Sequence, residues 1–247
     1  MSTGGTLLVV GVRGLGRDLA LHFARLGWNV ACAARTLADV DRLVSQVEEA
    51  GAAAGAGGRA LGQAADLLVP ESLREFCGRA VERFARIDLC VCAQTSGLAF
   101  AARPLLEAPP AELERALAAA PRGTLNLLQA IAPAMIAQGA GSFVQLGTGS
   151  GLSGRAGFGL QHTAQSALRA LVLHAAEELK PQGVHAAYLA VEGQIESERA
   201  QGYVQREGLA KTVPPLAIAE AVAWLHGQDP RAWTHELSLR PAASARR

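Results

Sequence analysis

Two glutamines four residues apart are the polar side chains whose spacing best suits a site. Gln161 and Gln165 lie in the segment GFGLQHTAQSAL, residues 157–168, which follows a Gly/Ser-rich turn and opens a long amphipathic run. Because residues i and i+4 share one face of a helix, both carboxamides are expected to lean inward together. A carboxamide donates and accepts hydrogen bonds, but it cannot shuttle a proton at neutral pH. The pair can therefore orient a ligand and cannot act as an acid or a base.

Two ionisable residues are alternatives for proton transfer. His162 carries an imidazole, a side chain that can exchange protons near neutral pH, but it lies about 100° around the helix from Gln161, so it is expected to face solvent or an interface. Only a register shift of one residue would bring it into the site. Glu192 could be a general base or a charge on the rim, and the rim position is favoured. The remaining histidines are scattered and show no metal-ligand spacing.

A glycine-rich turn is the second candidate site. It reads Gly11-Val12-Arg13-Gly14-Leu15-Gly16. Glycines suit such a turn because its backbone N–H groups must approach a pyrophosphate and the following helix N-terminus favours an anion. The turn lies between a predicted strand and a predicted helix, which is the context that a dinucleotide-binding site needs.

Charged residues at the next two strand ends bear on which nucleotide would bind. Arg35 ends the second predicted strand, where an Asp or Glu would hold a ribose diol. A cation there favours a 2′-phosphate, so NADP(H) is expected over NAD(H), although Arg35 could equally face solvent. Asp66 follows the third predicted strand and is expected either to bond an adenine amine or to cap a turn.

Composition limits the class of protein. The chain has 247 residues, of which 50% are hydrophobic and 18% charged, so one globular α/β domain spanning residues 1–247 is expected. A net charge of +1 offers no electrostatic basis for binding nucleic acid or an anionic membrane. No signal-peptide pattern and no apolar run of about 18 residues occurs, so a cytoplasmic protein is expected. Four cysteines, without a redox or zinc spacing, are expected to be buried thiols: Cys32, Cys77, Cys90 and Cys92.

Short β-rich runs alternate with helical patterns along the whole chain. Strands are predicted at residues 6–10, 28–34, 59–64, 87–93, 142–146, 184–189 and 236–239. Helices are predicted at residues 14–26, 37–50, 71–85, 158–180 and 216–226, and a long one at 111–137 that Pro121 and Pro133 interrupt. This alternation indicates a Rossmann-like, doubly wound domain with a mostly parallel seven-stranded sheet and helices on both faces. Residues 241–247 are expected to form a short tail.

Several segments in this order resemble the short-chain dehydrogenase/reductase family. They read GVRGLGRDLALHFARLGWNVACAAR, AADL, ERFARIDLCVCA, RGTLNLL, GSFVQLGTGSG, AEELKPQGVHAAYLAVEGQIES and IAEAVAWL. The resemblance extends from about Leu7 to Arg240. The segments GRAGF and WTHELSLRP look most like a divergent branch, in which the active-site tyrosine is itself often replaced.

The resemblance implies where the family's catalytic residues would fall. In the family a Tyr transfers the proton, a Lys four residues later lowers the pKa of that Tyr, a Ser orients the substrate and an Asn holds a relay water. By position the Tyr falls at Gln161, the Lys at Gln165 and the Asn at Ala120. The Ser falls at Thr148, or at Gly149 if the loop shifts by one residue. Residues 146–165 therefore look like a degenerate active-site segment.

The cofactor motifs also depart from the family pattern. The glycine turn is one residue shorter than the family's usual form. The family's Asn-Asn-Ala-Gly run appears as Cys92-Ala93-Gln94-Thr95, and its Pro-Gly as Glu192-Gly193, followed by Gln194-Ile195-Glu196-Ser197. By position, Ala93 and Ile195 would still line the cofactor.

Two functions follow from these patterns. The first is a family member without conventional redox chemistry, which would bind a nucleotide or small ligand, partner an active homologue or use unconventional chemistry. The second is an NADPH-dependent reductase of a small carbonyl compound that uses Thr148 and water. The resemblance further implies a homodimer or homotetramer, or a hetero-oligomer with an active homologue.

Overall fold

The structure is a computed structural model that describes residues 4–94, 102–152 and 154–243. One sheet has the strand order β3-β2-β1-β4-β5-β6-β9, and every neighbouring pair is parallel. The strands are β1 (Thr6–Val10), β2 (Asn29–Ala34), β3 (Ala60–Ala64), β4 (Leu89–Cys92), β5 (Gly141–Thr148), β6 (Val184–Val191) and β9 (Glu236–Leu239). The prediction of a seven-stranded, doubly wound α/β fold is confirmed.

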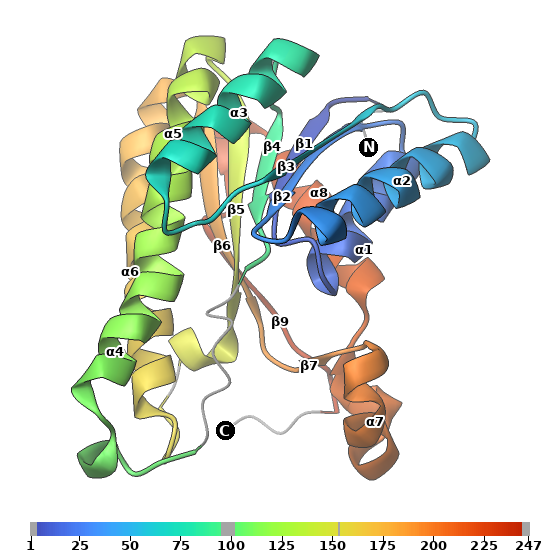
Figure 1. The fold of residues 1–247 in the computed structure, drawn as a ribbon. Coiled ribbons are helices and arrows are strands. Elements are labelled where there is room, and N and C mark those ends of the chain that lie inside the picture. The colour runs from blue at the N-terminus through green and yellow to red at the C-terminus, as the bar shows by residue number, and fades with distance from the viewer. Residues whose placement is uncertain (1–3, 95–101, 153, 244–247) are drawn as a thin grey trace.

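Helices cover both faces of this sheet (Figure 1). One face carries α1 (Leu15–Arg25), α2 (Leu37–Ala53) and α8 (Pro215–His226). The other carries α3 (Pro70–Phe84), α5 (Gly123–Gln138) and α6 (Gly159–Leu179). The helix α4 (Pro110–Leu117) precedes α5 and extends beyond the end of the sheet.

The core has two halves because strand side chains alternate between the faces. In β1, Leu7 and Val9 pack on the side of α1, α2 and α8, whereas Leu8 and Val10 pack on the side of α3 and α5. All five residues of β1 are buried. A continuous apolar run is therefore what a central parallel strand, covered by helices on both faces, requires.

The long helix predicted at residues 111–137 is continuous but changes form in the middle. It runs through α4, a π-helical turn at Ala118–Arg122, and α5. Pro121 lies in this turn, where its missing N–H removes an ordinary helical bond. The prediction that Pro133 also interrupts the helix is wrong. Pro133 lies inside α5 on its exposed side, where water can satisfy the carbonyl group that it leaves unbonded.

Periodicity missed the small elements between β6 and α8. The helix α7 spans Gln201–Glu207, and a two-stranded sheet pairs β7 (Gln194–Ile195) with β8 (Thr212–Val213). Thr212 Oγ1 donates to Glu196 Oε1 at 2.8 Å and so holds the two short strands together. Elements of two to seven residues are too short to show a period in the sequence.

The four cysteines are free and buried, as expected. Cys90 and Cys92 pack in the same half of the core. Burial raises the pKa of the Cys77 thiol to about 12 and that of Cys92 to about 11, so both are protonated at neutral pH. None of the described helices is both long enough and apolar enough to cross a membrane.

Candidate functional site

The carboxyl ends of β1, β2 and β4 meet at one point of the sheet. The strand order reverses between β1 and β4, and in such sheets ligands bind in the crevice outside the strand ends at this reversal. Gly11 N donates to Ala33 O, and Ala93 N donates to Val10 O, both at 2.9 Å. A Cβ on Gly11 would lie 3.2 Å from the backbone nitrogen of Gln94. The glycine turn therefore lies where this crevice is expected.

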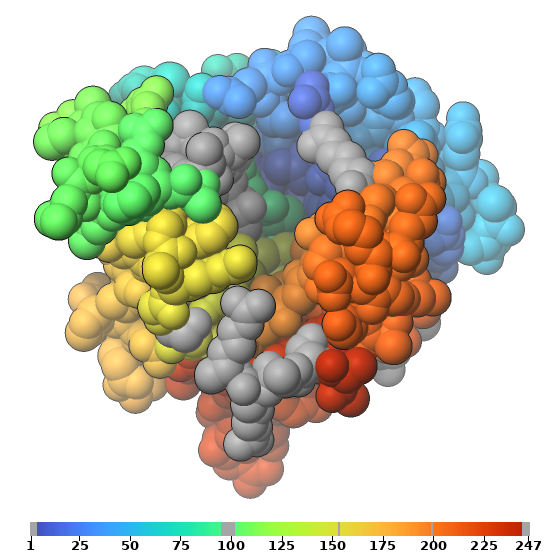
Figure 2. Space-filling model, turned by 90° about the horizontal axis from the view of Figure 1, so that it is seen from below, coloured from blue at the N-terminus to red at the C-terminus, as the bar shows by residue number. Residues whose placement is uncertain are grey.

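The space-filling view shows a hollow at this end of the molecule. In Figure 2, α4 and the start of α6 (green and yellow) lie on one side of it and α7 (orange) on the other. The predicted motif Cys92–Thr95 reaches this region, and its last residue lies outside the described residues. Ala93 and Ile195 are each half-buried.

The glycine turn leaves the start of α1 open to a ligand. Gly14 is the N-cap with φ +54°, and no side chain caps the helix there. A Cβ on Gly14 would have no atom within 4 Å, so the space beside it is free. A Cβ on Gly16 would instead lie 1.7 Å from Gly11 O, so glycine is needed for α1 to approach the turn. An anion can thus reach the N–H groups of the first turn, beside the half-buried Leu15.

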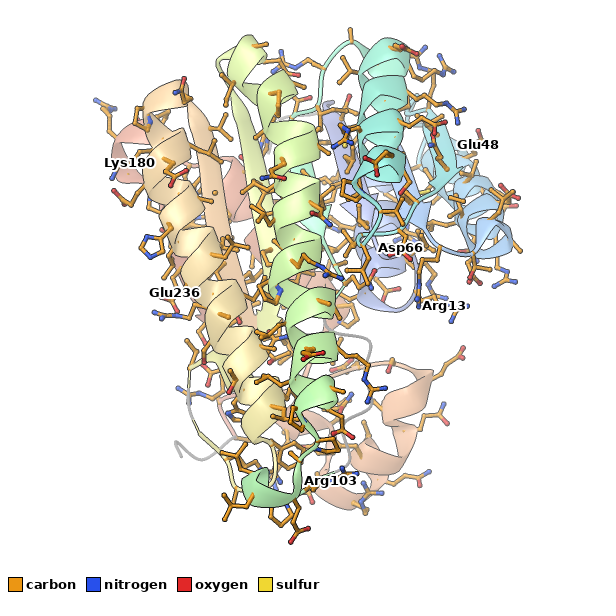
Figure 3. All side chains as sticks on the ribbon, turned by 60° about the vertical axis from the view of Figure 1, so that its left-hand side comes forward. Arg13, Glu48, Asp66, Arg103, Lys180 and Glu236 are labelled. Carbon is orange, nitrogen blue, oxygen red and sulfur yellow. The ribbon has the colours of Figure 1, made fainter. Side chains whose placement is uncertain are left out.

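Two arginines, Arg13 and Arg35, lie near the open start of α1. Arg13 donates to Asp39 Oδ2 from Nε at 3.0 Å and from Nη2 at 2.5 Å, and Figure 3 shows it directed outward below α1 and α2. Arg35 follows β2, is exposed, and has no hydrogen bond or ion pair within the described part of the chain. It is free to meet a ligand from this edge of the sheet.

Asp66 caps a turn, which is one of the two roles expected for it. Its Oδ1 accepts a hydrogen bond from Leu68 N at 2.9 Å. Asn126 of α5 donates from Nδ2 to Leu67 O at 2.7 Å and so ties the same turn to α5, on the face of the sheet that also carries α3. The turn is therefore held by hydrogen bonds both within itself and to α5. A contact between Asp66 and an adenine amine stays a prediction.

Thr148 is the last residue of β5 and begins the short 3₁₀ turn Gly149–Gly151. Its Oγ1 accepts a hydrogen bond from Ser150 N at 3.2 Å. The hydroxyl is half-buried, and within the described residues its proton has no acceptor. A Cβ on Gly149 would lie 2.9 Å from Glu192 Cγ, so that position offers only backbone. Thr148 is therefore the hydroxyl at the end of β5, and Ser150 supplies a second one within the turn.

The two glutamines of α6 differ in their surroundings. Gln161 is half-buried, whereas Gln165 is only 1% exposed. Among the described residues, neither the Oε1 nor the Nε2 atom of Gln165 has a hydrogen-bond partner. Leaving a buried polar group unsatisfied costs about 1–3 kcal/mol, so such a group indicates a partner that the protein itself does not supply.

Gln145, in the neighbouring strand β5, is the opposite case. It is fully buried, and its Oε1 accepts from Thr124 Oγ1 at 2.8 Å. Its Nε2 donates to Leu146 O at 2.8 Å and to Cys92 O at 3.3 Å. The fold therefore satisfies one buried carboxamide completely and leaves the other, Gln165, without a partner.

Tyr188 fills the space beneath Thr148. The sequence did not reveal this position of the Tyr188 side chain. The residue lies on β6, is fully buried, and donates from its hydroxyl to Thr148 O at 3.3 Å. Its ring occupies the place where a Cβ on Gly147 would lie, and it packs in one small cluster with Ala120. Burial raises the pKa of Tyr188 to about 12. The neutral phenol of Tyr188 is thus a structural group. In the sequence, only small neighbours such as Gly147 indicated that a large side chain fills this space.

Glu192 is half-buried and paired, and its position on the rim of a nicotinamide pocket stays a prediction. Its side chain is 21% exposed and accepts a hydrogen bond from Ser238 Oγ. Arg240 Nη1 lies 3.6 Å from Glu192 Oε2. A carboxylate engaged by both a hydroxyl and a guanidinium stabilises the end of β9 and is poorly placed to remove a proton.

A cavity of about 580 Å³ lies at the opposite end of the sheet, where strands β5, β6 and β9 begin. It is lined by the start of β5, the end of α8 and the segment before β9, including Ser142, His226 and Trp233. None of the residues of the glycine turn, and neither Thr148 nor the α6 glutamines, lines it. The candidate site is therefore the crevice at the carboxyl ends of the strands.

Known proteins share this fold. The model of the short chain dehydrogenase family matches residues 6–207, and this chain belongs to that family. An uncharacterised oxidoreductase of Mycobacterium tuberculosis is 32% identical over 172 residues, which cover 69% of this chain and 62% of that protein's length.

Two solved structures are similar over nearly the whole chain. A short-chain dehydrogenase from Rhodopseudomonas palustris has a TM-score of 0.78 at 24% identity, and the match covers 98% of this chain and 100% of that one. A metagenomic short-chain oxidoreductase in complex with NADP has a TM-score of 0.75 at 26% identity, covering 96% and 97%.

The residues at the crevice fit a nicotinamide dinucleotide. The open N-terminus of α1 suits a pyrophosphate, and the unsatisfied carboxamide of Gln165 suits a hydroxyl-bearing group of a ligand. The chemistry that such a cofactor supplies is hydride transfer. The proton that must accompany the hydride has to come from the protein or from water.

Proposed function

We propose that this chain is a dinucleotide-binding member of the short-chain dehydrogenase family that lacks the family's usual proton transfer. The observation that carries the proposal is Gln165, a buried carboxamide that has no partner among the described residues and lies at the position where the family has a lysine. The half-buried Gln161 precedes it by one helical turn, at the position of the family's tyrosine. Neither side chain exchanges a proton at neutral pH.

Tyr188 does not replace the missing acid. Its pKa is raised to about 12, and its hydroxyl donates to a backbone carbonyl group. A phenol in this state gives up its proton far less readily than a group whose pKa lies near 7. The site therefore favours binding of a nucleotide over conventional turnover.

NADP(H) is the dinucleotide that we propose. Support comes from Arg35, which is exposed and unpaired among the described residues at the end of β2, and from Arg13, which lies in the glycine turn. Guanidinium groups at this edge match a 2′-phosphate better than a ribose diol. The similar metagenomic oxidoreductase holds NADP in its structure.

Calorimetric titration with NADPH and NADH, combined with an assay of a panel of carbonyl compounds and alcohols, tests the proposal. We expect binding that favours NADPH and no turnover. The double variant Gln161→Tyr/Gln165→Lys should then gain turnover, since it restores an acid and a cation on one helix face. The variant Gln161→Phe/Gln165→Met, which has similar volume and no such groups, is the control. Turnover by the unaltered protein would contradict the proposal.

A reductase that uses Thr148 is the second candidate. The observation in its favour is the Thr148 hydroxyl, whose proton has no acceptor in the described structure and is free to bond a substrate carbonyl. Loss of general acid catalysis costs about 10²- to 10⁴-fold in rate, so slow turnover through water would still be measurable. Under this alternative Thr148→Ala abolishes turnover and Thr148→Ser retains it. Equal rates for the two variants would exclude a role for the hydroxyl.

A further inference from the structure

Four charged side chains gather where α1 and α2 begin. They are Arg13, Arg35, Arg42 and Asp39. Gly11 N donates to Ala33 O, so the turn that carries Arg13 runs beside the end of β2, which Arg35 follows directly. Asp39 and Arg42 belong to α2, the helix that β2 leads into.

Asp39 is the only carboxylate in this group, and both of its oxygens are engaged. Oδ2 accepts from Arg13 Nε and Nη2, at 3.0 Å and 2.5 Å, and Oδ1 accepts from Arg42 Nη1 at 3.3 Å. The Asp39 side chain is 14% exposed, whereas those of the two arginines are 67% and 69% exposed. Asp39 also lies in the first turn of α2, where the helix dipole favours a negative charge. Asp39 is therefore the less exposed partner, and it holds the two more exposed arginines.

In a Rossmann domain, residues at the carboxyl end of the second strand distinguish a 2′-hydroxyl from a 2′-phosphate on the adenosine ribose. The four charged side chains lie around this end of β2. Arg35 is free to meet a 2′-phosphate there, but two donors of Arg13 are already used by Asp39. A phosphate beside Arg13 would also face the negative charge of Asp39. The other acid near the start of α1, Asp18, is paired with Arg17 of the same helix.

We propose that Asp39 is a specificity-determining residue, which restrains Arg13 and so weakens binding of a 2′-phosphate. The inference rests on the proposed function, because it concerns the nucleotide expected in that crevice. In this proposal the selectivity for NADP(H) depends on a competition between charges. Arg35 and Arg13 attract the 2′-phosphate, and Asp39 weakens its binding by holding Arg13. Neutralising Asp39 releases Arg13 and removes a like charge while leaving the backbone of α2 unchanged.

Titration with two nucleotides that differ only in the 2′-phosphate tests this competition. The probes are adenosine 2′,5′-bisphosphate and adenosine 5′-monophosphate, measured by calorimetry on the full chain. We expect Asp39→Asn to strengthen binding of the bisphosphate about fivefold, as removal of one nearby like charge at a water-exposed site implies. Binding of the monophosphate should change less than about twofold, because it lacks the group that Asp39 opposes.

Two further variants separate this role from a general change in charge. Asp41→Asn makes the same charge change at an exposed position of the same helix and should leave both affinities unchanged. Arg13→Ala should weaken only the bisphosphate. If wild-type protein binds the bisphosphate and Asp39→Asn binds it equally or more weakly, the inference is wrong and the proposed function stands. If neither nucleotide binds to wild type or variant, both are overturned.

Discussion

Gln165 and Gln145 have the same side chain and opposite environments. Both are buried, but within the part of the chain that the structure describes Gln145 makes three hydrogen bonds and Gln165 makes none. A satisfied buried carboxamide stabilises the fold, whereas an unsatisfied one loses its hydration without replacement. In the ligand-free protein Gln165 is therefore a site of unfavourable free energy, which a bound hydroxyl-bearing ligand would relieve.

Substitution by leucine makes this contrast measurable. Gln165→Leu should raise the free energy of unfolding of the ligand-free protein by about 1 kcal/mol, because an unpaired polar group is replaced by an apolar one of similar size. Gln145→Leu should lower it by about 2–4 kcal/mol, because it leaves Thr124 and two carbonyl groups without a partner. Urea denaturation gives both values. Destabilisation by Gln165→Leu in the absence of nucleotide would show that this carboxamide has a partner.

At the scale of an element, α3 ends in an unfavourable backbone conformation. Its C-cap, Ala85, has φ +68° and donates from N to Val81 O at 2.7 Å. Ala85 is the only residue other than glycine, among those described, with a positive φ. The left-handed conformation costs a residue with a Cβ roughly 1–2 kcal/mol, which glycine avoids.

Replacement of Ala85 by glycine should therefore stabilise the protein. We expect Ala85→Gly to raise the free energy of unfolding by about 0.5–1 kcal/mol, after allowance for the greater entropy of glycine in the unfolded chain. Ala54→Gly is the matched control, since Ala54 is the C-cap of α2 with φ −86°, where glycine brings no relief. Thermal or urea unfolding of the two variants decides the point. A loss of stability in both would contradict the conformational argument.

At the scale of the whole molecule, one buried and two half-buried histidines make stability depend on pH. Burial lowers the pKa of His22, His185 and His226 below the usual value, since a charged imidazole loses hydration in the core. Nearby Glu220 and Asp88 oppose this for His22 and His226 without reversing it. Between the folded and unfolded pKa values the unfolded chain binds more protons, so the free energy of unfolding falls as the pH falls below about 6.5.

Urea denaturation at several pH values measures this dependence. From pH 7.5 to 5.5 we expect the free energy of unfolding to fall by about 1–3 kcal/mol, since each histidine that stays neutral only in the folded state contributes up to about 1.4 kcal/mol per pH unit. From pH 8.5 to 7.5 histidine contributes almost nothing, so that interval is the internal control. Constant or rising stability on acidification to pH 5.5 would show that these histidines are protonated in the folded protein.

The sequence by itself determined the fold class and most of the elements. Short apolar runs such as Thr6–Val10 alternate with amphipathic helical segments. This local pattern predicts the strands, the helices and the doubly wound sheet. The glycines between the first strand and helix pointed to the glycine turn, the i, i+4 spacing pointed to the two glutamines of α6, and the family resemblance pointed to Thr148. Short elements such as α7 were missed, because seven residues show too little of a period.

Only the tertiary structure decided which of these side chains have partners. Gln165 has no partner among the described residues, Tyr188 lies beneath Thr148, and Asp39 holds Arg13. Each of these features depends on segments that lie apart in the sequence. Tyr188 and Thr148 are 40 residues apart, and Arg13 and Asp39 are 26. Burial and hydrogen bonding between such residues depend on how whole helices and strands pack, and a local pattern of residue types carries no record of that packing.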